Sequence, residues 1–255
     1  MDCISEGSDD ILRARLEDTV YLCDKRGTPC YLGFLDLREQ AAARLMLPSM
    51  AEADSYAFYG GYPEAERCLL SVSPAYYTAE ESDYPLCTVA FRYRAQKQLT
   101  HRDVLGTLMS IGIRRDAVGD ILCGEGLSVV FLRNDVSRYV CEQIDRIGGE
   151  GVKTIPDYDG ELPLSVEYES IRETVASPRL DSIVKALIHC SREKAAELIR
   201  VGSVSVNHRP IESVSAIVSE NTTVSVRGHG RYIIYQIGPE TKKGRLTLLA
   251  GRRLE

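Results

Sequence analysis

The stretch from residue 86 to residue 155 constrains the fold of this chain more than any other feature. Alternating apolar residues predict strands, apolar residues at helical spacing predict helices, and glycines mark the joints. The expected elements are a strand at 86–93, a helix at 100–111, strands at 119–123 and 127–132, a helix at 135–147 and a strand at 151–155. This order of strands and helices leaves few possible topologies for the segment.

The order is that of a ferredoxin-like (RRM-like) β-α-β-β-α-β unit, which many RNA-recognition modules use. Such modules stack bases on aromatic side chains of their central strands, and Phe91, Tyr93 and Phe131 are available here. Because residues i and i+2 of a strand share a face, we expect Phe91 and Tyr93 to lie in the core beneath the helices. The aromatic signature of RNA-recognition motifs is missing from the sequence. The segment therefore supports the fold and gives only weak support to base stacking.

Net charge changes sign along the chain. Residues 1–83 carry 7 Lys and Arg against 16 Asp and Glu, residues 84–156 carry 10 against 8, residues 157–174 carry 1 against 6, and residues 175–255 carry 13 against 7. We therefore expect an α+β protein of three small domains with the following parts: an acidic N-terminal α/β domain (1–83), the ferredoxin-like middle domain (84–156), an acidic connector (157–174), a C-terminal domain (175–240) and a basic C-terminal tail (241–255). A basic end behind an acidic body predicts that a polyanion binds there.

Composition excludes several classes of protein. With 44% apolar and 27% charged residues, the 255-residue chain can form real cores, so wholesale disorder is not expected. No apolar run approaches the roughly 18 to 20 residues of a membrane span, and the first ten residues are acidic rather than basic. The eight cysteines form no CxxC pair and have no histidine at zinc spacing. We expect a cytoplasmic protein with reduced thiols, no metal site and no membrane partner.

The N-terminal third predicts helices at 11–22 and 36–47, the second closed by Pro48. A loop follows at residues 59–63, where two glycines precede a proline. Paired glycines can let a backbone approach a phosphate, but beside a proline they indicate a turn. We do not assign a nucleotide site to this loop.

The C-terminal module predicts two short amphipathic helices followed by a small sheet. Ser177 is the expected N-cap of the first helix, with Pro178 at its first position, and Ser191 is the expected N-cap of the second. Strands are expected at 204–207 and 223–228, and the acidic connector can carry one edge strand. Because apolar residues occupy one face of each helix, the cations gather on the remainder, which makes a shared basic face possible.

Four motifs occur in order along this module: Arg179-Leu180-Asp181, Ser191-Arg192-x-x-Ala195, Leu198-Ile199-x-x-Gly202-x-Val204-x-Val206-Asn207 and Val226-Arg227-Gly228. Together they resemble an RNA-binding domain named after the fourth protein of the small ribosomal subunit, here the S-four domain. In that family two helices and the Val-x-Val-Asn turn face structured RNA. The resemblance implies the RNA-facing residues Arg179, Asp181, Lys185, Ser191, Arg192, Lys194, Arg200, Asn207 and Arg227.

Within this set the resemblance implies that the cations meet phosphates, while Ser191 and Asn207 position the RNA backbone. We expect Asp181 to orient a neighbouring arginine rather than to touch RNA. The chain has Glu220-Asn221 where the family usually has Gly-Asp before the last strand, and asparagine tolerates the left-handed conformation of that turn.

A second resemblance covers nearly the full chain. It rests on Phe58-Tyr59-Gly60-Gly61-Tyr62, on the segment 99–106, on Gly112-Ile113 and on Gly119-Asp120-Ile121, combined with the C-terminal S-four domain. This combination resembles the YlmH type of bacterial RNA-binding protein. The resemblance implies association with the large ribosomal subunit in the rescue of stalled nascent chains, with ribosomal RNA and transfer RNA as partners. A link to cell division is also attached to the family name.

Catalysis is the main alternative, because S-four domains are also fused to pseudouridine synthases and tyrosyl-tRNA synthetases. The one Arg-Leu-Asp string, 179–181, continues as Ser182-Ile183-Val184-Lys185 instead of the synthase setting. No phosphate-loop, HExxH or GxSxG motif is present in the sequence. We predict an RNA binder without enzymatic activity or small-molecule cofactor. An RNA-modifying enzyme of the pseudouridine-synthase type remains the alternative, and a protein-interaction scaffold that uses the acidic region is a third possibility.

Overall fold

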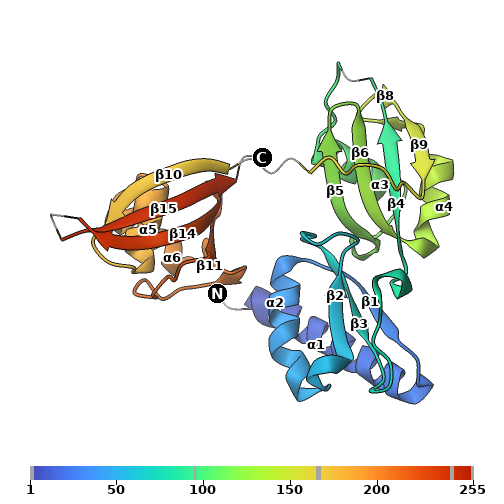
Figure 1. Cartoon of the computed structure of the whole chain (residues 1–255), viewed down its shortest axis with the longest axis horizontal. Helices are drawn as coiled ribbons and strands as arrows, with labels where there is room; N and C mark the ends of the chain where they lie inside the picture. Colours follow the sequence, from blue (N-terminus) through green and yellow to red (C-terminus); the bar gives the residue numbers. More distant parts are fainter. Residues whose placement is uncertain (1–2, 95, 165–167, 242–243, 254–255) are drawn as a thin grey trace. The chain divides into compact units, whose positions relative to one another are not determined.

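The computed structural model describes residues 3–94, 96–164, 168–241 and 244–253 (Figure 1). The chain forms two compact units that divide at residues 165 and 166, here called unit 1 and unit 2. Every strand pairing among the described residues is antiparallel. Both units combine helices with antiparallel sheets, which confirms the expected α+β class.

The first half of unit 1 packs two helices against a three-stranded sheet of order β1-β3-β2. Its elements are α1 (Cys3–Arg26), β1 (Cys30–Leu35), α2 (Leu37–Met46), the single turns η1 (Leu47–Ser49) and η2 (Ala53–Ser55), β2 (Tyr56–Tyr59) and β3 (Cys68–Val72). Helix α1 is longer than the expected 11–22. Helix α2 begins where the sequence predicts, because the side chains of Asp36 and Glu39 each accept the backbone N–H of the other. Since the sheet is antiparallel, this half is α+β and not α/β.

The second half of unit 1 has the expected ferredoxin-like arrangement, with the main strands in the order β5-β6-β4-β9. Its elements are η3 (Glu81–Asp83), β4 (Leu86–Arg92), α3 (His101–Ser110), η4 (Arg115–Ala117), β5 (Val118–Gly124), β6 (Leu127–Arg133), α4 (Asn134–Gln143), the hairpin β7 (Arg146–Ile147) and β8 (Glu150–Gly151), and β9 (Lys153–Pro156). The helix expected to reach residue 147 ends at Gln143. Ile144 is extended, and it and Ile147 are buried in the core, so the chain turns inward there.

The two faces of this four-stranded sheet are both covered. Phe91 and Tyr93 lie in the core beneath α3 and α4, as expected, with exposed fractions of 0% and 8%. On the other face, Phe131 is 1% exposed and stacks on Tyr62, with ring centroids 5.1 Å apart. The segment after β9 crosses the strands (Figure 1), and its Tyr158 joins the same hydrophobic cluster. Residues on both sides of the expected boundary at 83 and 84 therefore share one core.

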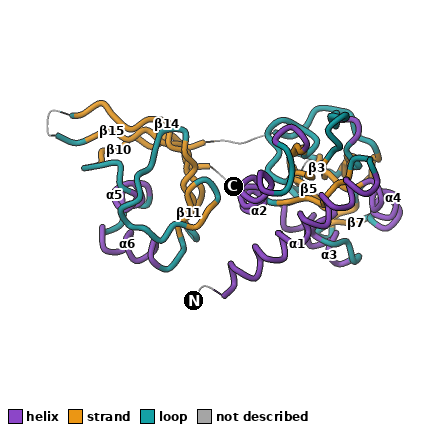
Figure 2. The backbone as a smooth tube through the Cα atoms, turned by 90° about the horizontal axis from the view of Figure 1, so that it is seen from below, coloured by secondary structure: helices purple, strands orange, loops and turns teal. Residues whose placement is uncertain are grey.

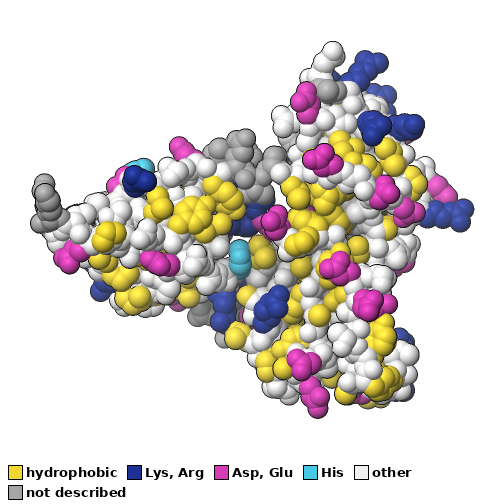
Figure 3. Space-filling view, in the orientation of Figure 1, with side chains coloured by type: hydrophobic (Ala, Val, Ile, Leu, Met, Phe, Trp, Pro, Cys, Tyr) yellow, Lys and Arg dark blue, Asp and Glu magenta, His cyan; other side chains and the backbone are white. Residues whose placement is uncertain are grey.

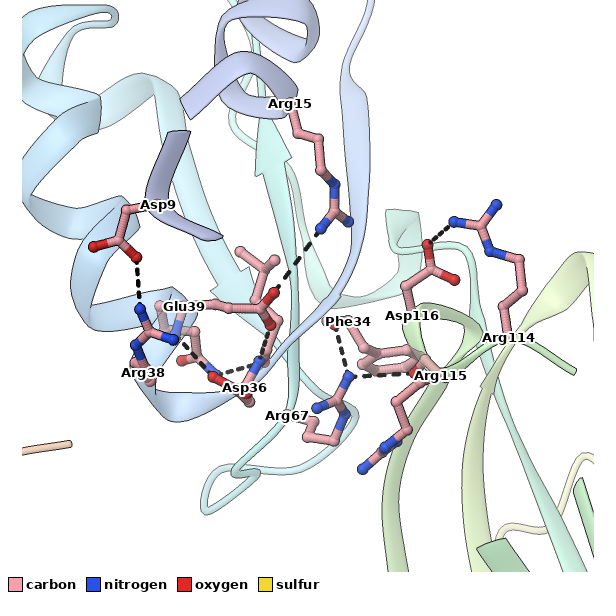
Figure 4. Close-up of polar contacts among 12 residues, drawn as sticks. Asp9, Arg15, Phe34, Asp36, Arg38, Glu39, Arg67, Arg114, Arg115 and Asp116 are labelled. Atoms are coloured by element: carbon pink, nitrogen blue, oxygen red, sulfur yellow. Dashed lines mark hydrogen bonds and ion pairs between the residues drawn. The ribbon is translucent and has the colours of Figure 1, made fainter. Parts of the chain in front are cut away.

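The glycine loop at 60–66 docks the first half of unit 1 on the second. Gly61 has a φ of 100°, and a Cβ there would lie 2.3 Å from the Phe131 ring. The hydroxyl of Tyr62 donates to Asp120 Oδ2 at 2.7 Å. Arg67 Nη2 donates to the carbonyl oxygens of Phe34 and Arg115 at 2.9 and 3.2 Å (Figure 4). The loop is therefore a packing element, in agreement with its assignment as a turn.

Unit 2 covers one side of a six-stranded sheet with two helices (Figures 1 and 2). Its elements are β10 (Tyr168–Val175), α5 (Leu180–Leu187), α6 (Arg192–Arg200), β11 (Val204–Val206), β12 (Arg209–Pro210), β13 (Thr222–Val226), β14 (Gly230–Glu240) and β15 (Leu246–Arg253). The strand order is β10-β15-β14-β13-β11-β12. The apolar sides of α5 and α6 and the inner face of the sheet form one core.

The sheet of unit 2 is larger than the small sheet expected from the sequence. The second half of the expected connector forms β10, an edge strand, and most of the expected basic tail forms β15, which lies between β10 and β14. Leu248 and Ala250 are fully buried on β15 because alternate residues of a strand point to the same side. The Lys and Arg residues of this segment predict a solvated tail, whereas its apolar residues at 246, 248 and 250 fit a strand with one buried side.

Helix α5 begins later than predicted. Its N-cap is Arg179 and not Ser177, and Pro178 lies before the helix. Arg179 forms a β-bridge with Ile217, and the backbone N–H groups of Leu180 and Asp181 donate to the carbonyl oxygens of Ala216 and Val214. The neighbouring segment thus satisfies the first N–H groups, so a side-chain cap is not required. Helix α6 has the predicted cap, because Ser191 Oγ accepts the N–H of Lys194.

Candidate nucleic-acid interface

Asp181, in the first turn of α5, binds two of the predicted RNA-facing arginines. Its Oδ1 accepts Nε of Arg179 at 3.1 Å and the backbone N–H of Ser182 at 3.0 Å, and its Oδ2 accepts Nε of Arg192 at 2.8 Å. The Asp181 side chain is 3% exposed, whereas those of Arg179 and Arg192 are 38% and 58% exposed. The carboxylate therefore joins the starts of α5 and α6 and leaves guanidinium N–H groups available to a ligand.

Two opposing effects act on the pKa of Asp181. Burial favours the neutral acid and would raise the pKa, but the hydrogen bonds and positive charges of Arg179 and Arg192 stabilise the carboxylate, and the pKa is lowered. Asp181 is therefore ionised near neutral pH. Its negative charge compensates part of the positive charge of the two arginines and holds them in place, which agrees with the expected orienting role.

A groove of about 380 Å³ runs along β10, α5 and the start of α6. Its cationic lining residues are Lys185, Arg192 and Arg245, and His189 lies beside them. Glu173 is the one carboxylate among the described residues that line the groove, and His189 Nδ1 lies 3.8 Å from its Oε1. The groove therefore carries an excess of positive charge and is open to solvent.

Arg245 reaches this groove from a distant part of the chain. It lies just before β15, and its Nε and Nη2 donate to the hydroxyl and the carbonyl oxygen of Thr174 at 3.0 and 2.5 Å. These bonds hold the guanidinium against strand β10. An arginine fixed in this way can present its remaining N–H groups to a phosphate with little loss of conformational entropy.

Of the other predicted residues, Ser191 and Lys194 lie beside Arg192 at the start of α6, whereas Arg200, Asn207 and Arg227 lie elsewhere in unit 2. The Ser191 hydroxyl caps α6, and Lys194 pairs with Glu197 at 3.0 Å. Arg200 ends α6, roughly 12 Å along the helix axis from Arg192. Arg227 lies nearer that end, because its N–H donates to the carbonyl oxygen of Ser203.

Asn207 occupies the turn between β11 and β12, and its Oδ1 accepts the N–H of Thr223 at 3.0 Å. This bond shows that the Asn207 side chain stabilises the turn against β13. The structure thus brings Arg179, Asp181, Lys185 and Arg192 together along α5 and the start of α6. It places Arg200, Asn207 and Arg227 elsewhere, so the nine residues do not form a single patch. Their assignment to RNA contacts stays a prediction.

Sequence reasoning missed Arg245 and His189 as members of the groove. The signal for Arg245 was present, since residues 241–255 hold five Lys and Arg residues and an alternating apolar pattern at 246–250. The pairing of that strand with β10 could not be derived from either observation. His189 has a φ of 51°, a conformation set by the turn between α5 and α6.

Within residues 3–94, 96–164, 168–241 and 244–253, no group of three or more His, Cys, Asp or Glu side chains is placed to hold a metal ion. In the same described ranges, no helix combines the length and apolarity needed to cross a membrane. The groove lined by Lys185, Arg192 and Arg245 is the candidate site in unit 2, because its cations fit anionic oxygen atoms.

Two family models match the chain. Residues 79–156 match "Putative RNA-binding domain in YlmH", and residues 178–224 match the S4 domain, which is the expected S-four domain. The fold and the groove thus define a protein of the S4-domain class. A relative from Bacillus subtilis (strain 168), "Ribosome-associated protein quality control protein P2", is 37% identical over 215 residues, 82% of this chain and 82% of the relative. The chain belongs to the YlmH family of S4-domain proteins.

A solved structure has a related fold. The "Cell division protein ylmH from Streptococcus pneumoniae" matches with a TM-score of 0.52 and 15% sequence identity, over 58% of this chain and 90% of that chain. A likeness at this identity shows the fold alone. It agrees with the mixed architecture of helices and sheets described above.

Proposed function

We propose that this protein is a non-catalytic, cytoplasmic RNA-binding protein that docks on structured ribosomal or transfer RNA. It does so on the large ribosomal subunit, in the rescue or quality control of stalled nascent chains. The observation that carries the proposal is the groove of unit 2, where Lys185, Arg192 and Arg245 surround a surface with one carboxylate, Glu173, among its described lining residues. Cations arranged along an open groove suit a phosphate backbone.

The relatives support the ribosomal part of the proposal. The name of the Bacillus subtilis relative places that protein in ribosome-associated quality control, and the similarity extends over 82% of both chains. The model that matches residues 79–156 is described as an RNA-binding domain, and the model that matches residues 178–224 is the S4 domain, a class of RNA-binding domain. We carry the role over to this chain on the strength of that coverage.

Docking is electrostatic in this mechanism. Lys185, Arg192 and Arg245 contact phosphates, and Asp181 holds the guanidinium of Arg192 in position. We expect the whole protein to neutralise about six phosphates. The logarithm of the association constant then falls linearly with the logarithm of the salt concentration, with a slope of roughly −4 to −5. Affinity then depends on RNA shape and charge more than on base sequence.

The test is an RNA-binding titration of the full chain in which one groove cation is removed at a time. We expect Lys185→Ala and Arg245→Ala each to weaken binding to total transfer RNA and to flatten the salt slope by about one unit. Arg172→Ala is the matched control, because Arg172 is exposed on β10 and does not line the groove. Equal effects of groove and control variants would overturn the assignment of the groove.

The enzymatic alternative has a separate readout. Bulk ribosomal and transfer RNA are incubated with the protein, digested to nucleosides and analysed by mass. We expect no new modified nucleoside. A pseudouridine or other modification that depends on the protein would replace the non-catalytic proposal. Co-sedimentation with large subunits that carry a peptidyl-tRNA tests the ribosomal part, and absence from that fraction would contradict it.

A further inference from the structure

A second cluster of cations lies on unit 1, outside the S4 domain. Its members are exposed Lys and Arg side chains at the end of the four-stranded sheet: Arg92, Arg94, Lys97, Arg146 and Lys153. Strand β4 ends at Arg92, strand β9 begins at Lys153, and the hairpin of β7 and β8 lies between α4 and β9. Figure 3 shows Lys and Arg side chains gathered at this end of unit 1, where Figure 1 labels β8. We call these five residues the sheet-end cluster.

The backbone pairing places two of these cations side by side. Arg92 and Lys153 are direct partners in the antiparallel pair of β4 and β9, so their Cβ atoms are about 4.5 to 5.5 Å apart. Like charges opposite one another weaken strand pairing. Neither Arg92 nor Lys153 has an ion-pair partner among the described residues. The pairing of β4 with β9 is therefore not stabilised by these two side chains, and their juxtaposition has no structural benefit within the described residues.

The remaining cations surround Glu150. Lys97 Nζ forms an ion pair with Glu150 Oε1, and this hydrogen bond together with the charges of Lys97, Arg94 and Arg146 lowers the pKa of Glu150. The carboxylate is thus ionised and compensates one of the five positive charges. Glu125 and Asp145 lie on the flanking turns, and the side chain of Asp103 lies beside Gly148 of the β7–β8 hairpin. The five cations therefore face four carboxylates, and positive charge remains in slight excess at this place. Residues 1–156 carry 17 Lys and Arg against 24 Asp and Glu, so the cluster is a local exception on an acidic unit.

The sheet face that RNA-recognition modules use for base stacking is closed in this protein. Phe131 is 1% exposed and stacks on Tyr62, and Ala90 and Val129 are fully buried on the same face. Tyr158 of the segment after β9 packs there as well. Any RNA contact of the middle domain has to be made outside this face.

We propose that the middle domain binds the phosphate backbone of structured RNA through the sheet-end cluster, with no base stacked on its sheet. The three cations without an ion pair among the described residues, Arg92, Arg94 and Lys153, make the phosphate contacts. Lys97 and Arg146 compensate the negative charge of the ionised Glu150 beside them. The inference rests on the proposed function, since the same folded RNA binds both units. A contact on each unit strengthens the complex, because the second contact forms at a high effective concentration.

The experiment removes the three unpaired cations from the full chain. The variant Arg92→Ala/Arg94→Ala/Lys153→Ala is titrated with purified large-subunit ribosomal RNA and, separately, with total transfer RNA. We expect the dissociation constant for at least one of these RNAs to rise about tenfold or more near 0.15 M salt, and the salt slope to flatten by about two to three units. An unchanged thermal unfolding curve shows that the substitutions did not alter the fold.

The matched control is Arg13→Ala/Lys25→Ala/Arg26→Ala, which removes the same charge from exposed positions of α1 in the same unit. We expect it to change RNA affinity by less than about twofold. Equal losses in the two triple variants would show that net charge alone acts, and would overturn the proposal. Unchanged RNA affinity together with weaker binding to whole large subunits would assign the cluster to a protein partner and would likewise overturn it.

Failure of this inference differs from failure of the proposed function. If Lys185→Ala and Arg245→Ala weaken RNA binding while the sheet-end variant does not, the proposed function stands and the sheet-end cluster is rejected. If no variant in either unit weakens binding, the proposed RNA-binding function itself is rejected. If a Phe131→Leu variant, with the fold retained, loses affinity as strongly as the sheet-end variant, base stacking contributes and the backbone-only mode is wrong.

Discussion

Each unit contains a buried aspartate near two arginines, but the arginines of the two units differ in what they bind. In unit 1, Asp120 is 9% exposed and accepts hydrogen bonds from the hydroxyl of Tyr62 and from the backbone N–H groups of Glu66 and Arg67. The side chains of Arg67 and Arg115 donate to backbone carbonyl oxygens around it. Burial lowers the pKa of Arg67 and lowers that of Arg115 to about 10.

In unit 2, Arg179 and Arg192 donate to the carboxylate of Asp181, and their side chains are 38% and 58% exposed. The difference teaches how one set of residue types serves two purposes. The guanidinium groups of Arg67 and Arg115 are largely buried and satisfy carbonyl oxygens, so they stabilise the fold, whereas the exposed guanidinium groups of Arg179 and Arg192 remain able to bind an anion. Charged clusters are therefore assigned from their hydrogen bonds and not from composition.

Removal of Asp120 should have the largest effect. In Asp120→Ala, a hydroxyl and two backbone N–H groups lose their acceptor inside the protein, so we expect unit 1 to lose about 3 to 5 kcal/mol of unfolding free energy. Hydrogen exchange measures this for each unit separately, since a two-unit chain does not unfold as one two-state system. The control is Asp116→Ala, which breaks a pair with the 82% exposed Arg114 and should cost less than about 1 kcal/mol. Similar losses in both variants would remove the distinction between buried and exposed clusters.

A methyl group at Gly61 tests the packing beside Asp120. Gly61→Ala places a Cβ 2.3 Å from the Phe131 ring at a φ of 100°, and we expect a loss of about 2 to 4 kcal/mol in unit 1. Gly112→Ala separates the two causes, because Gly112 has a φ of 88° with nothing within 4 Å of the added Cβ. It should cost about 1 to 2 kcal/mol. Equal values from urea unfolding would mean that the contact with Phe131 contributes nothing.

A lysine in place of each arginine sharpens the comparison directly. Arg67→Lys retains the charge but cannot reach the carbonyl oxygens of Val118, Phe34 and Arg115 together, so we expect a loss of about 2 to 3 kcal/mol. Arg192→Lys, at an exposed position, should cost less than about 1 kcal/mol. Thermal unfolding monitored for each unit checks both values. A larger loss from Arg192→Lys would show that the guanidinium of Arg192 is structural as well.

A smaller effect than that of Arg67→Lys is expected at Asp181. Asp181→Asn weakens the bonds to Arg179 and Arg192, whose exposed guanidinium groups can turn to water instead, so unit 2 should lose about 1 to 2 kcal/mol near neutral pH. The lowered pKa of Asp181 means that its contribution is present above the unfolded pKa of about 4 and is lost as the pH falls through the folded pKa. Wild type and variant should therefore converge in stability at acid pH. A difference that grows on acidification would contradict the lowered pKa.

Much of the fold could be predicted because local patterns set it. The alternation at 86–93 and 127–132 reproduces β4 and β6 to within one residue, and the hydroxyl of Ser191 marks the start of α6. The candidate site was only half predictable. Lys185 and Arg192 follow from the S-four resemblance, but Arg245 joins them only because β15 pairs with β10, a contact between segments some seventy residues apart in the sequence.

By itself, the sequence determined which segments form helices and strands, which end of the chain is basic and which family the chain resembles, since periodicity, capping and charge are local properties. The tertiary structure decided the rest. Tyr62 packs on Phe131 and covers the sheet face that RNA-recognition modules use for base stacking, and most of the expected basic tail forms a strand beside β10. The tertiary structure also directed Arg67 and Arg115 of unit 1 to carbonyl oxygens, and Arg179 and Arg192 of unit 2 to the carboxylate of Asp181. These outcomes depend on which surfaces meet when the core forms, and a local pattern carries no information about its distant partner.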